Sequence, residues 1–460
     1  MRSPWRLALL AFAQFIIALD FNIVYVALPE IGTEVGFTSG SLQWVVSAYA
    51  VGFGGFLLLG GRAADRLGSR RVFVIGLVLY AASSLVGGLV AEPWALIAAR
   101  AVQGLGGALL TPATLALIGL GFPEGGARNK ALAAWGMAGS AGLAAGSVAG
   151  GVLTTYLGWE WVFFVNVPLA LIAAFFAPRL LPRSEPRKGA FDVPGALVIT
   201  AGAALLVLGL ASGPEAGWVS VRGLGAMALG AVLVGVFLLI EARSRSPLAP
   251  LKTFADRGLS VTMGFIAVFQ ASLMGMVYVL TTYFQPVLGY DPLQAGLAFV
   301  PQTLVTVVGA GRLAPALIAR LGIRTSLALT AALTGAGLAA VTAGMSAGGS
   351  YWALLPGFAL WGLAGGACFV IMFAAAGSGI APEQQGVASG LATSAQQIGG
   401  AVGLAVLVAV VGTGAVPSLR AAGWIAAAAT AAGALIALLL ARSPARKRES
   451  PTEDGAVAVG

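Results

Sequence analysis

The sequence contains no histidine and a single cysteine, Cys368, among its 460 residues. Zinc sites built from Cys and His, and Cys/His nucleophilic pairs, therefore cannot be assembled, and one cysteine cannot form an intramolecular disulfide. Cys368 lies inside an apolar run, where we expect it to pack as a small hydrophobic side chain. These absences exclude several classes of enzyme and every disulfide-stabilised fold.

Charged residues are also scarce. They make up 9% of the chain, against about a quarter in soluble domains, whereas hydrophobic residues make up 58%. Apolar runs long enough to span a bilayer core of about 30 Å, roughly 20 helical residues, recur between short connections that carry Gly, Pro and Arg. The sequence therefore predicts an all-α, multi-pass membrane protein with no soluble catalytic domain, and we do not expect an enzyme.

The N-terminal apolar run follows basic residues, as the corresponding run of a signal peptide does. It is long enough to span a membrane, however, has no convincing small-residue cleavage site and carries Asp20. We interpret it as the first membrane-spanning helix.

Fourteen membrane-spanning helices are predicted along the chain. They lie near residues 7–28, 42–61, 72–91, 95–119, 132–156, 161–178, 193–212, 223–240, 258–282, 293–315, 323–344, 352–376, 386–411 and 421–441. With a cytoplasmic N-terminus, the outside connections hold only two basic residues, Arg222 and Arg420. The positive-inside rule then predicts that both termini are cytoplasmic and that the protein lies in the cell membrane. The net charge of +9 follows from this topology, and we expect no nucleic-acid partner.

Two of the predicted cytoplasmic loops are similar to each other. RLGSR at 66–70 and RLGIR at 320–324 are 254 residues apart and follow the second and tenth predicted spans. These loops are equivalent if spans seven and eight are an insertion. The predicted organisation is then six plus two plus six helices: an N-terminal half (1–182), two inserted helices with flanking loops (183–256), a pseudo-symmetric C-terminal half (257–442) and a disordered cytoplasmic tail (443–460).

Five motifs in order along the chain carry a family resemblance. They are LDFNIVYVALP (19–29), GGRAADRLGSRR (60–71), RAVQGLGGALLTP (100–112), GLAAGSVAGG (142–151) and GWEWVFFVNVP (158–168). They resemble the signatures of the first helix, the loop between the second and third helices, and helices four, five and six of the fourteen-span drug:proton antiporters of the major facilitator superfamily. The sequence departs from these signatures at four positions. Asn22 stands where Thr is usual and Tyr25 where Asn is usual, while Ser147 replaces the usual Pro and Glu160 the common Arg.

The resemblance implies a major facilitator fold that exports small hydrophobic or monocationic drug-like compounds in exchange for protons. It implies a monomer in the lipid bilayer that uses the proton gradient and no cofactor. A dedicated exporter of one natural product or antibiotic, and an uptake symporter, remain alternatives, as does a membrane receptor that kept the fold but lost transport. The Gly-rich run at 104–107 lies inside a predicted helix and lacks a following GK[ST], so it is no phosphate loop.

Asp20 and Arg100 are charged residues deep in apolar spans. At a rise of 1.5 Å per residue they lie roughly 12 Å and 8 Å below the outer ends of the first and fourth helices, so the two can meet. Burial favours the neutral acid, whereas a neighbouring arginine favours the carboxylate. We therefore predict that Asp20 and Arg100 couple transport to protons, and a purely structural ion pair is the alternative.

A gating role is predicted for the loop between the second and third helices, through Gly61, Asp65, Arg66, Gly68, Arg70 and Arg71. Gly68 allows a tight turn that other residues resist. By the resemblance, Asp65 pairs across the two halves in one state only. The alternative is a positive-inside loop that happens to contain an acid.

Small residues line one face of the predicted fifth span, which carries the antiporter signature with Gly142, Gly146, Ser147, Gly150 and Gly151. Such a face allows close approach of a neighbouring helix. A further set of residues is polar or departs from the family signature, and is predicted to line a cavity: Asn22, Tyr25, Gln103, Gln270, Gln302 and Arg312. For Arg312, snorkelling towards the cytoplasm is the alternative.

Overall fold

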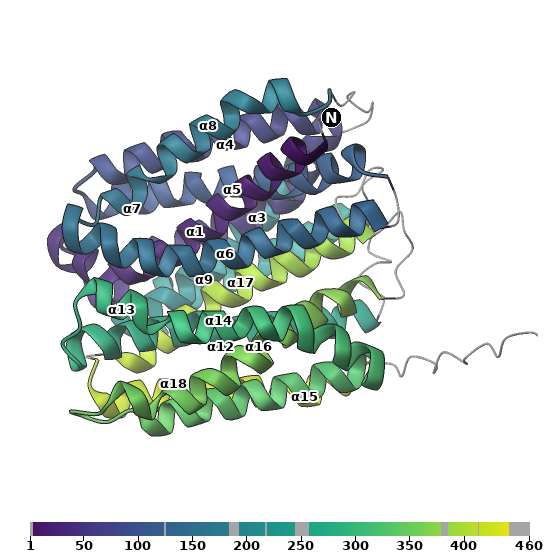
Figure 1. The fold of residues 1–460 in the computed structure, drawn as a ribbon. Helices are drawn as coiled ribbons and strands as arrows, with labels where there is room; N and C mark the ends of the chain where they lie inside the picture. Colours follow the sequence, from purple (N-terminus) through teal and green to yellow (C-terminus); the bar gives the residue numbers. More distant parts are fainter. Residues whose placement is uncertain are drawn as a thin grey trace, which may run out of the picture.

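The computed structural model describes residues 3–123, 126–183, 193–216, 219–243, 257–378, 385–412 and 414–440. Every regular element in these ranges is a helix, and the long helices run roughly side by side (Figure 1). Helices satisfy their backbone hydrogen bonds internally, which a lipid environment demands. The predicted all-α class is confirmed, while the tail 443–460 lies outside the described residues.

The first group of helices forms one bundle, coloured purple to blue in Figure 1. It consists of α1 (Ser3–Val35), α2 (Ser39–Leu42), α3 (Trp44–Leu67), α4 (Ser69–Leu89), α5 (Pro93–Gly121), α6 (Gly126–Leu157), α7 (Trp161–Phe164) and α8 (Asn166–Leu180). Helix α1 packs along α6, α5 packs on both α3 and α4, and α8 covers α4.

The last group forms a second bundle, coloured green to yellow. It consists of α12 (Arg257–Thr282), η2 (Tyr283–Val287), α13 (Pro292–Ala298), α14 (Val300–Val308), η3 (Gly309–Leu313), α15 (Ala314–Gly344), η4 (Tyr351–Ala353), α16 (Leu355–Gly377), α17 (Gln385–Val411) and α18 (Val416–Ala437). Here α12 packs along α17, α16 packs on both α14 and α15, and α15 packs on α18. The packing order of the first bundle is thus repeated.

Two further helices lie between these groups in the chain. Helix α9 (Val193–Ala216) packs against the pair formed by η1 (Val221–Gly225) and α10 (Ala226–Arg243). Helix α9 also contacts α3 of the first bundle and α17 of the second. Most of α10 is not buried, as expected of a helix that faces lipid.

Glycines with positive φ recur at a constant spacing in the two bundles. Gly68 has φ 90° and Gly322 has φ 73°, and they are 254 residues apart. Gly158 and Gly412, with φ 99° and 53°, have the same separation. Residues with a Cβ rarely adopt such angles, so glycine is required at each of these chain reversals. The turn predicted at Gly68 is confirmed, and its counterpart is the break inside α15 at Gly322.

The count of membrane spans differs from the prediction of fourteen. Within the described ranges, 11 helices are long and apolar enough to cross a membrane, or 12 if Gly40–Leu57 and Leu59–Leu67, which meet at 51°, form one span. Part of the difference arises because Pro292–Gly344 counts as one segment of 53 residues although Gly322 interrupts it. Helix α9 contributes only a short apolar stretch, Leu197–Leu206. Fourteen spans therefore stay a prediction.

The glycine face of α6 packs directly on α1. A Cβ at Gly142, Gly146 or Gly150 would overlap a backbone carbonyl oxygen of α1 in each case. The close helix approach predicted from these residues is confirmed. The adjacent face of α6 contacts the second bundle: a Cβ at Gly151 would lie 2.7 Å from the Cα of Leu293 in α13. Helix α6 therefore joins the two bundles.

We expect Gly146→Ala to destabilise the protein, because the new methyl group overlaps the Leu19 carbonyl oxygen and α1 must move away. Overpacking of this kind costs about 1–3 kcal/mol. Thermal unfolding of purified protein measures the effect. Gly264→Ala in α12 is the control, since a Cβ at Gly264 meets nothing within 4 Å. Equal unfolding midpoints for the two variants would contradict the packing account.

Candidate functional site

A buried ion pair lies inside the first bundle. Arg100 of α5 donates from Nη1 to Oδ2 of Asp20 in α1 at 2.7 Å, and the two side chains are 2% and 0% exposed. The contact predicted from their depths is therefore present. A charge in this position is stable only with its partner, because an unpaired ion in a low-dielectric interior costs several kcal/mol.

Two amides complete the surroundings of the Asp20 carboxylate. Gln103 Nε2 donates to Oδ1 at 2.8 Å, and Asn166 Nδ2 of α8 donates to the same oxygen at 2.9 Å. Gln103 also donates to the hydroxyl of Ser84 in α4 at 2.8 Å. With Arg100 the carboxylate receives three hydrogen bonds, so each of its two oxygens has a donor.

Arg100 has further partners besides the acid. Its Nε donates to the carbonyl of Val45 in α3 at 2.8 Å, and Nη1 also donates to Gln103 Oε1 at 2.6 Å. The guanidinium carbon lies 4.5 Å from the ring centroid of Tyr49 and 5.8 Å from that of Phe163. The aromatic faces add cation–π attraction to the ion pair. The network thus connects α1, α3, α4, α5, α7 and α8.

The sequence interpretation did not identify all members of this network. Gln103 was predicted to line a cavity, but it is 1% exposed and enclosed beside Asp20. Asn166 and Ser84 were not predicted, although each is fully buried. The available signal for Asn166 was an amide among apolar residues in the motif 158–168. Nothing in the spacing shows that its side chain turns towards α1.

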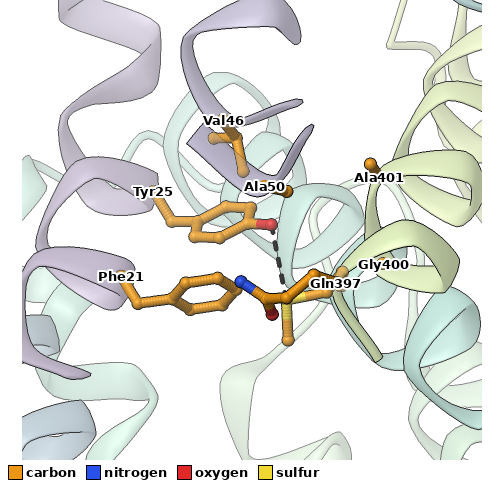
Figure 2. Close-up of a pocket in the computed structure, with 8 residues that line it drawn as sticks. Phe21, Tyr25, Val46, Ala50, Gln397, Gly400 and Ala401 are labelled. Atoms are coloured by element: carbon orange, nitrogen blue, oxygen red, sulfur yellow. Dashed lines mark hydrogen bonds between the residues drawn. The ribbon is translucent and has the colours of Figure 1, made fainter. Parts of the chain in front are cut away.

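A small pocket lies between the two bundles (Figure 2). One of its lining residues, Phe21, directly follows Asp20 in α1. It is lined by Phe21, Tyr25, Val46, Ala50, Met274, Gln397, Gly400 and Ala401. These residues come from α1 and α3 on one side and from α12 and α17 on the other. Figure 2 shows Phe21 and Tyr25 pointing from α1 towards Gln397. Tyr25, predicted as a cavity residue, donates from its hydroxyl to Met274 Sδ at 3.5 Å.

The pocket is nearly closed in this conformation. It has room for about one water molecule, whereas pockets for drug-sized ligands enclose roughly 300–1,000 Å³. The bundles are in close contact beside it, where Ser394 of α17 donates to the carbonyl of Gly54 in α3 at 3.2 Å. A compound of that size can enter only if the two bundles separate.

The remaining predicted cavity residues lie elsewhere. Asn22 donates to Ser147 Oγ at 3.1 Å, so it belongs to the contact between α1 and α6. Gln270 is buried, and Gln302 donates to Thr306 one turn along α14 at 3.1 Å. Arg312 is exposed in η3. None of the four is in the wall of this pocket, and their part in a cavity stays a prediction.

The predicted gating loop is attached to its own bundle. Arg70 Nη1 donates to the carbonyls of Pro178 and Leu181, both at 3.3 Å, at the end of α8. Asp65 is exposed, and among the described residues no ion pair involves it. The pairing of Asp65 across the two halves therefore stays a prediction. Gly61, Arg66 and Arg71 lie in the same segment of α3 and α4.

Known proteins resemble this chain over most of its length. It is 37% identical over 410 residues to the puromycin resistance protein pur8 of Streptomyces alboniger, covering 88% of this chain and 81% of that protein. It is 38% identical over 412 residues to the cephamycin export protein of Amycolatopsis lactamdurans, covering 89% and 85%.

A solved structure shows the same fold. The crystal structure of an auto-inhibited peptide transporter of the POT family superposes with a TM-score of 0.69 at 17% identity, covering 98% of this chain and 99% of that one. The family model of the Major Facilitator Superfamily matches residues 10–404. The helical bundles, the ordered motifs and these matches agree, and the chain belongs to the major facilitator superfamily of membrane transporters.

Proposed function

We propose that this protein exports small, largely apolar compounds in exchange for protons. The observation that carries the proposal is the Asp20 carboxylate, which is 0% exposed, paired with Arg100 and held by two amides. An ionisable group inside a membrane is costly, so a functional role is its default explanation. Both walls of the pocket come from one chain, which supports transport by a monomer, and we propose that the proton gradient supplies the energy without a cofactor.

The geometry suggests how a proton could act. In the ionised state the carboxylate holds Arg100 and the two amides in place. Protonation removes the charge and turns one carboxylate oxygen into a donor, so these hydrogen bonds must rearrange. A rearrangement that favours separated bundles would shift the transporter between its inward-facing and outward-facing states.

The pocket supports an apolar substrate. Among the described residues, its wall contains the rings of Phe21 and Tyr25, the thioether of Met274 and one amide, Gln397, but no charged side chain. A neutral aromatic or aliphatic compound would therefore meet no uncompensated charge there. Asp20 is enclosed behind this wall, so we propose that proton and substrate influence one another without sharing a contact.

We also propose the arrangement of six, two and six spans with both termini in the cytoplasm. The repeated packing order and the paired glycines at Gly68 and Gly322 support it. The segment Pro292–Gly344 has 53 residues, and such a helix would be about 80 Å long, more than twice the bilayer core. Two spans that meet at Gly322 fit better, and α9 with α10 would be the inserted pair.

A dedicated exporter of one antibiotic is the second candidate. Several relatives have names that refer to a single compound: puromycin, cephamycin, tetracenomycin C and lincomycin. Another is called a multidrug resistance protein. Accumulation of a panel of these antibiotics and of fluorescent dyes, in cells without their own pumps, separates the two candidates. Export of one compound alone favours the dedicated exporter, and collapse of the proton gradient must stop export in both.

Asp20→Asn should reduce gradient-driven export to the level of cells that lack the protein. The change keeps the size of the side chain but removes the group that binds a proton. Accumulation assays measure export, and the amount of protein in the membrane fraction controls for insertion. Undiminished uphill export by this variant would rule out the coupling role of Asp20.

Arg100→Ala should behave like Asp20→Asn at neutral pH but recover part of its activity at higher pH. Without Arg100 the buried acid has no counter-charge, so it keeps its proton until the pH is raised. Arg100→Lys should retain part of the activity, because it keeps the charge but loses the planar fork. Proton-driven transport in proteoliposomes, measured against pH, tests both variants. An equal loss at every pH would assign Arg100 a structural role.

A further inference from the structure

The charge network and the pocket are neighbours that do not open into one another. Asp20 is 0% exposed and is absent from the pocket wall, whereas the next residue, Phe21, is part of that wall. In this conformation Asp20 is therefore separated from the pocket by the wall. If the two are linked, as the proposed function requires, other side chains must transmit the change.

Tyr49 of α3 lies between the two sites. The guanidinium carbon of Arg100 lies 4.5 Å from the centroid of the Tyr49 ring. The same ring makes an edge-to-face contact with Phe21, with centroids 6.4 Å apart and an interplanar angle of 68°. Phe21 in turn contacts Tyr25, with ring centroids 5.9 Å apart, and both rings line the pocket. Tyr49 is 1% exposed, so it cannot move without its neighbours.

We propose that Tyr49 is a positioning residue whose ring links the protonation of Asp20 to the opening of the pocket. This role rests on the proposed proton coupling. The Asp20 carboxylate fixes the place of the Arg100 guanidinium, and cation–π attraction depends on where that cation lies over the ring. When Asp20 becomes neutral, Arg100 loses its counter-charge but keeps the carbonyl of Val45 and Gln103 as acceptors, so its guanidinium shifts over the ring of Tyr49, and that ring and then Phe21 change position. If protonation of Asp20 changes the affinity of the pocket for a compound by a given factor, linkage requires that the bound compound changes the proton affinity of Asp20 by the same factor.

Within the part of the chain that the structure describes, three charged or titratable side chains face Asp20 from the helices packed around it: Arg100 of α5, Tyr49 of α3 and Tyr80 of α4. Arginine stays charged and tyrosine stays neutral near neutral pH, so the proposal assigns the change of protonation to Asp20. The competing route is α1 itself, because Asp20 and Phe21 are adjacent in the same helix.

A cysteine in the opposite wall of the pocket can report its opening. Ala401 of α17 lines the pocket and is 2% exposed, so a cysteine there reacts only when the bundles separate. The native Cys368 is buried, and its own rate of labelling is measured in protein that lacks Ala401→Cys. The full chain in lipid vesicles is treated with a small methanethiosulfonate reagent at one pH. Labelling rates are compared between native Asp20 and Asp20→Asn, which imitates the protonated acid.

With native Tyr49, Asp20→Asn should raise the labelling rate of Ala401→Cys by about threefold or more, within the range of measured couplings between sites. Tyr49→Phe should preserve this ratio, because the ring and not the hydroxyl makes both contacts. Tyr49→Leu should bring the ratio close to one. Phe73→Leu in α4 is the matched control, since Phe73 is a buried ring of the same bundle that is absent from the pocket wall, and among the described residues no ring contact joins it to Tyr49 or Phe21. It should leave the ratio high.

Phe21→Leu provides a second break in the same chain of contacts, in case Tyr49→Leu does not insert stably, and it too should bring the ratio close to one. A ratio that stays high in both variants would assign the coupling to α1 and overturn the role of Tyr49. If, with native Tyr49, Ala401→Cys is labelled equally fast with Asp20 and with Asp20→Asn, the role of Tyr49 is overturned as well. Labelling does not depend on transport, so normal uphill export by Asp20→Asn would reject proton coupling separately.

Discussion

A carboxylate enclosed in a membrane protein is tolerated only when each of its oxygens has donors. Asp20 meets this condition with Arg100, Gln103 and Asn166, which come from two other helices of the first bundle. Arg100 in turn requires a carbonyl of α3 and aromatic rings. One buried charge therefore dictates how most helices of this bundle are rotated. The same dependence makes the bundle sensitive to the loss of that charge.

The second organising feature is backbone contact without side chains. Gly142, Gly146 and Gly150 place α6 against the main chain of α1, while Gly151 approaches α13. Between the bundles, Gly54 of α3 faces α17, where a Cβ would lie 2.9 Å from the Cβ of Gln397. The bundles also share an apolar core, because buried side chains of α1 and α3 belong to one cluster with those of α12 and α17, so separation of the bundles requires these side chains to repack. The packed charge network lies inside a bundle and can move as a unit.

Sequence reasoning predicted the features that depend on strong local signals. An acid and an arginine in apolar spans are conspicuous, and their depths were enough to predict the contact of Asp20 with Arg100. The turn at Gly68 and the small-residue face of α6 were predictable for similar reasons. The partners Asn166 and Ser84, and the walls of the pocket, were not. Spans that are apolar on all sides do not reveal which face turns inward, so rotation about the helix axis is undetermined.

The separation of the charge network from the pocket has a consequence for how such a protein can change. Half of the pocket wall, including Met274, Gln397 and Ala401, belongs to the second bundle, whereas Asp20 and Arg100 belong to the first. Under the proposed mechanism, substitutions there alter the shape of the compound that fits and leave the proposed coupling pair unchanged. Phe21 is the exception, because it touches Tyr49 as well as the pocket. New substrates are therefore accessible by mutation at most wall positions, but tolerance should be lowest at Phe21.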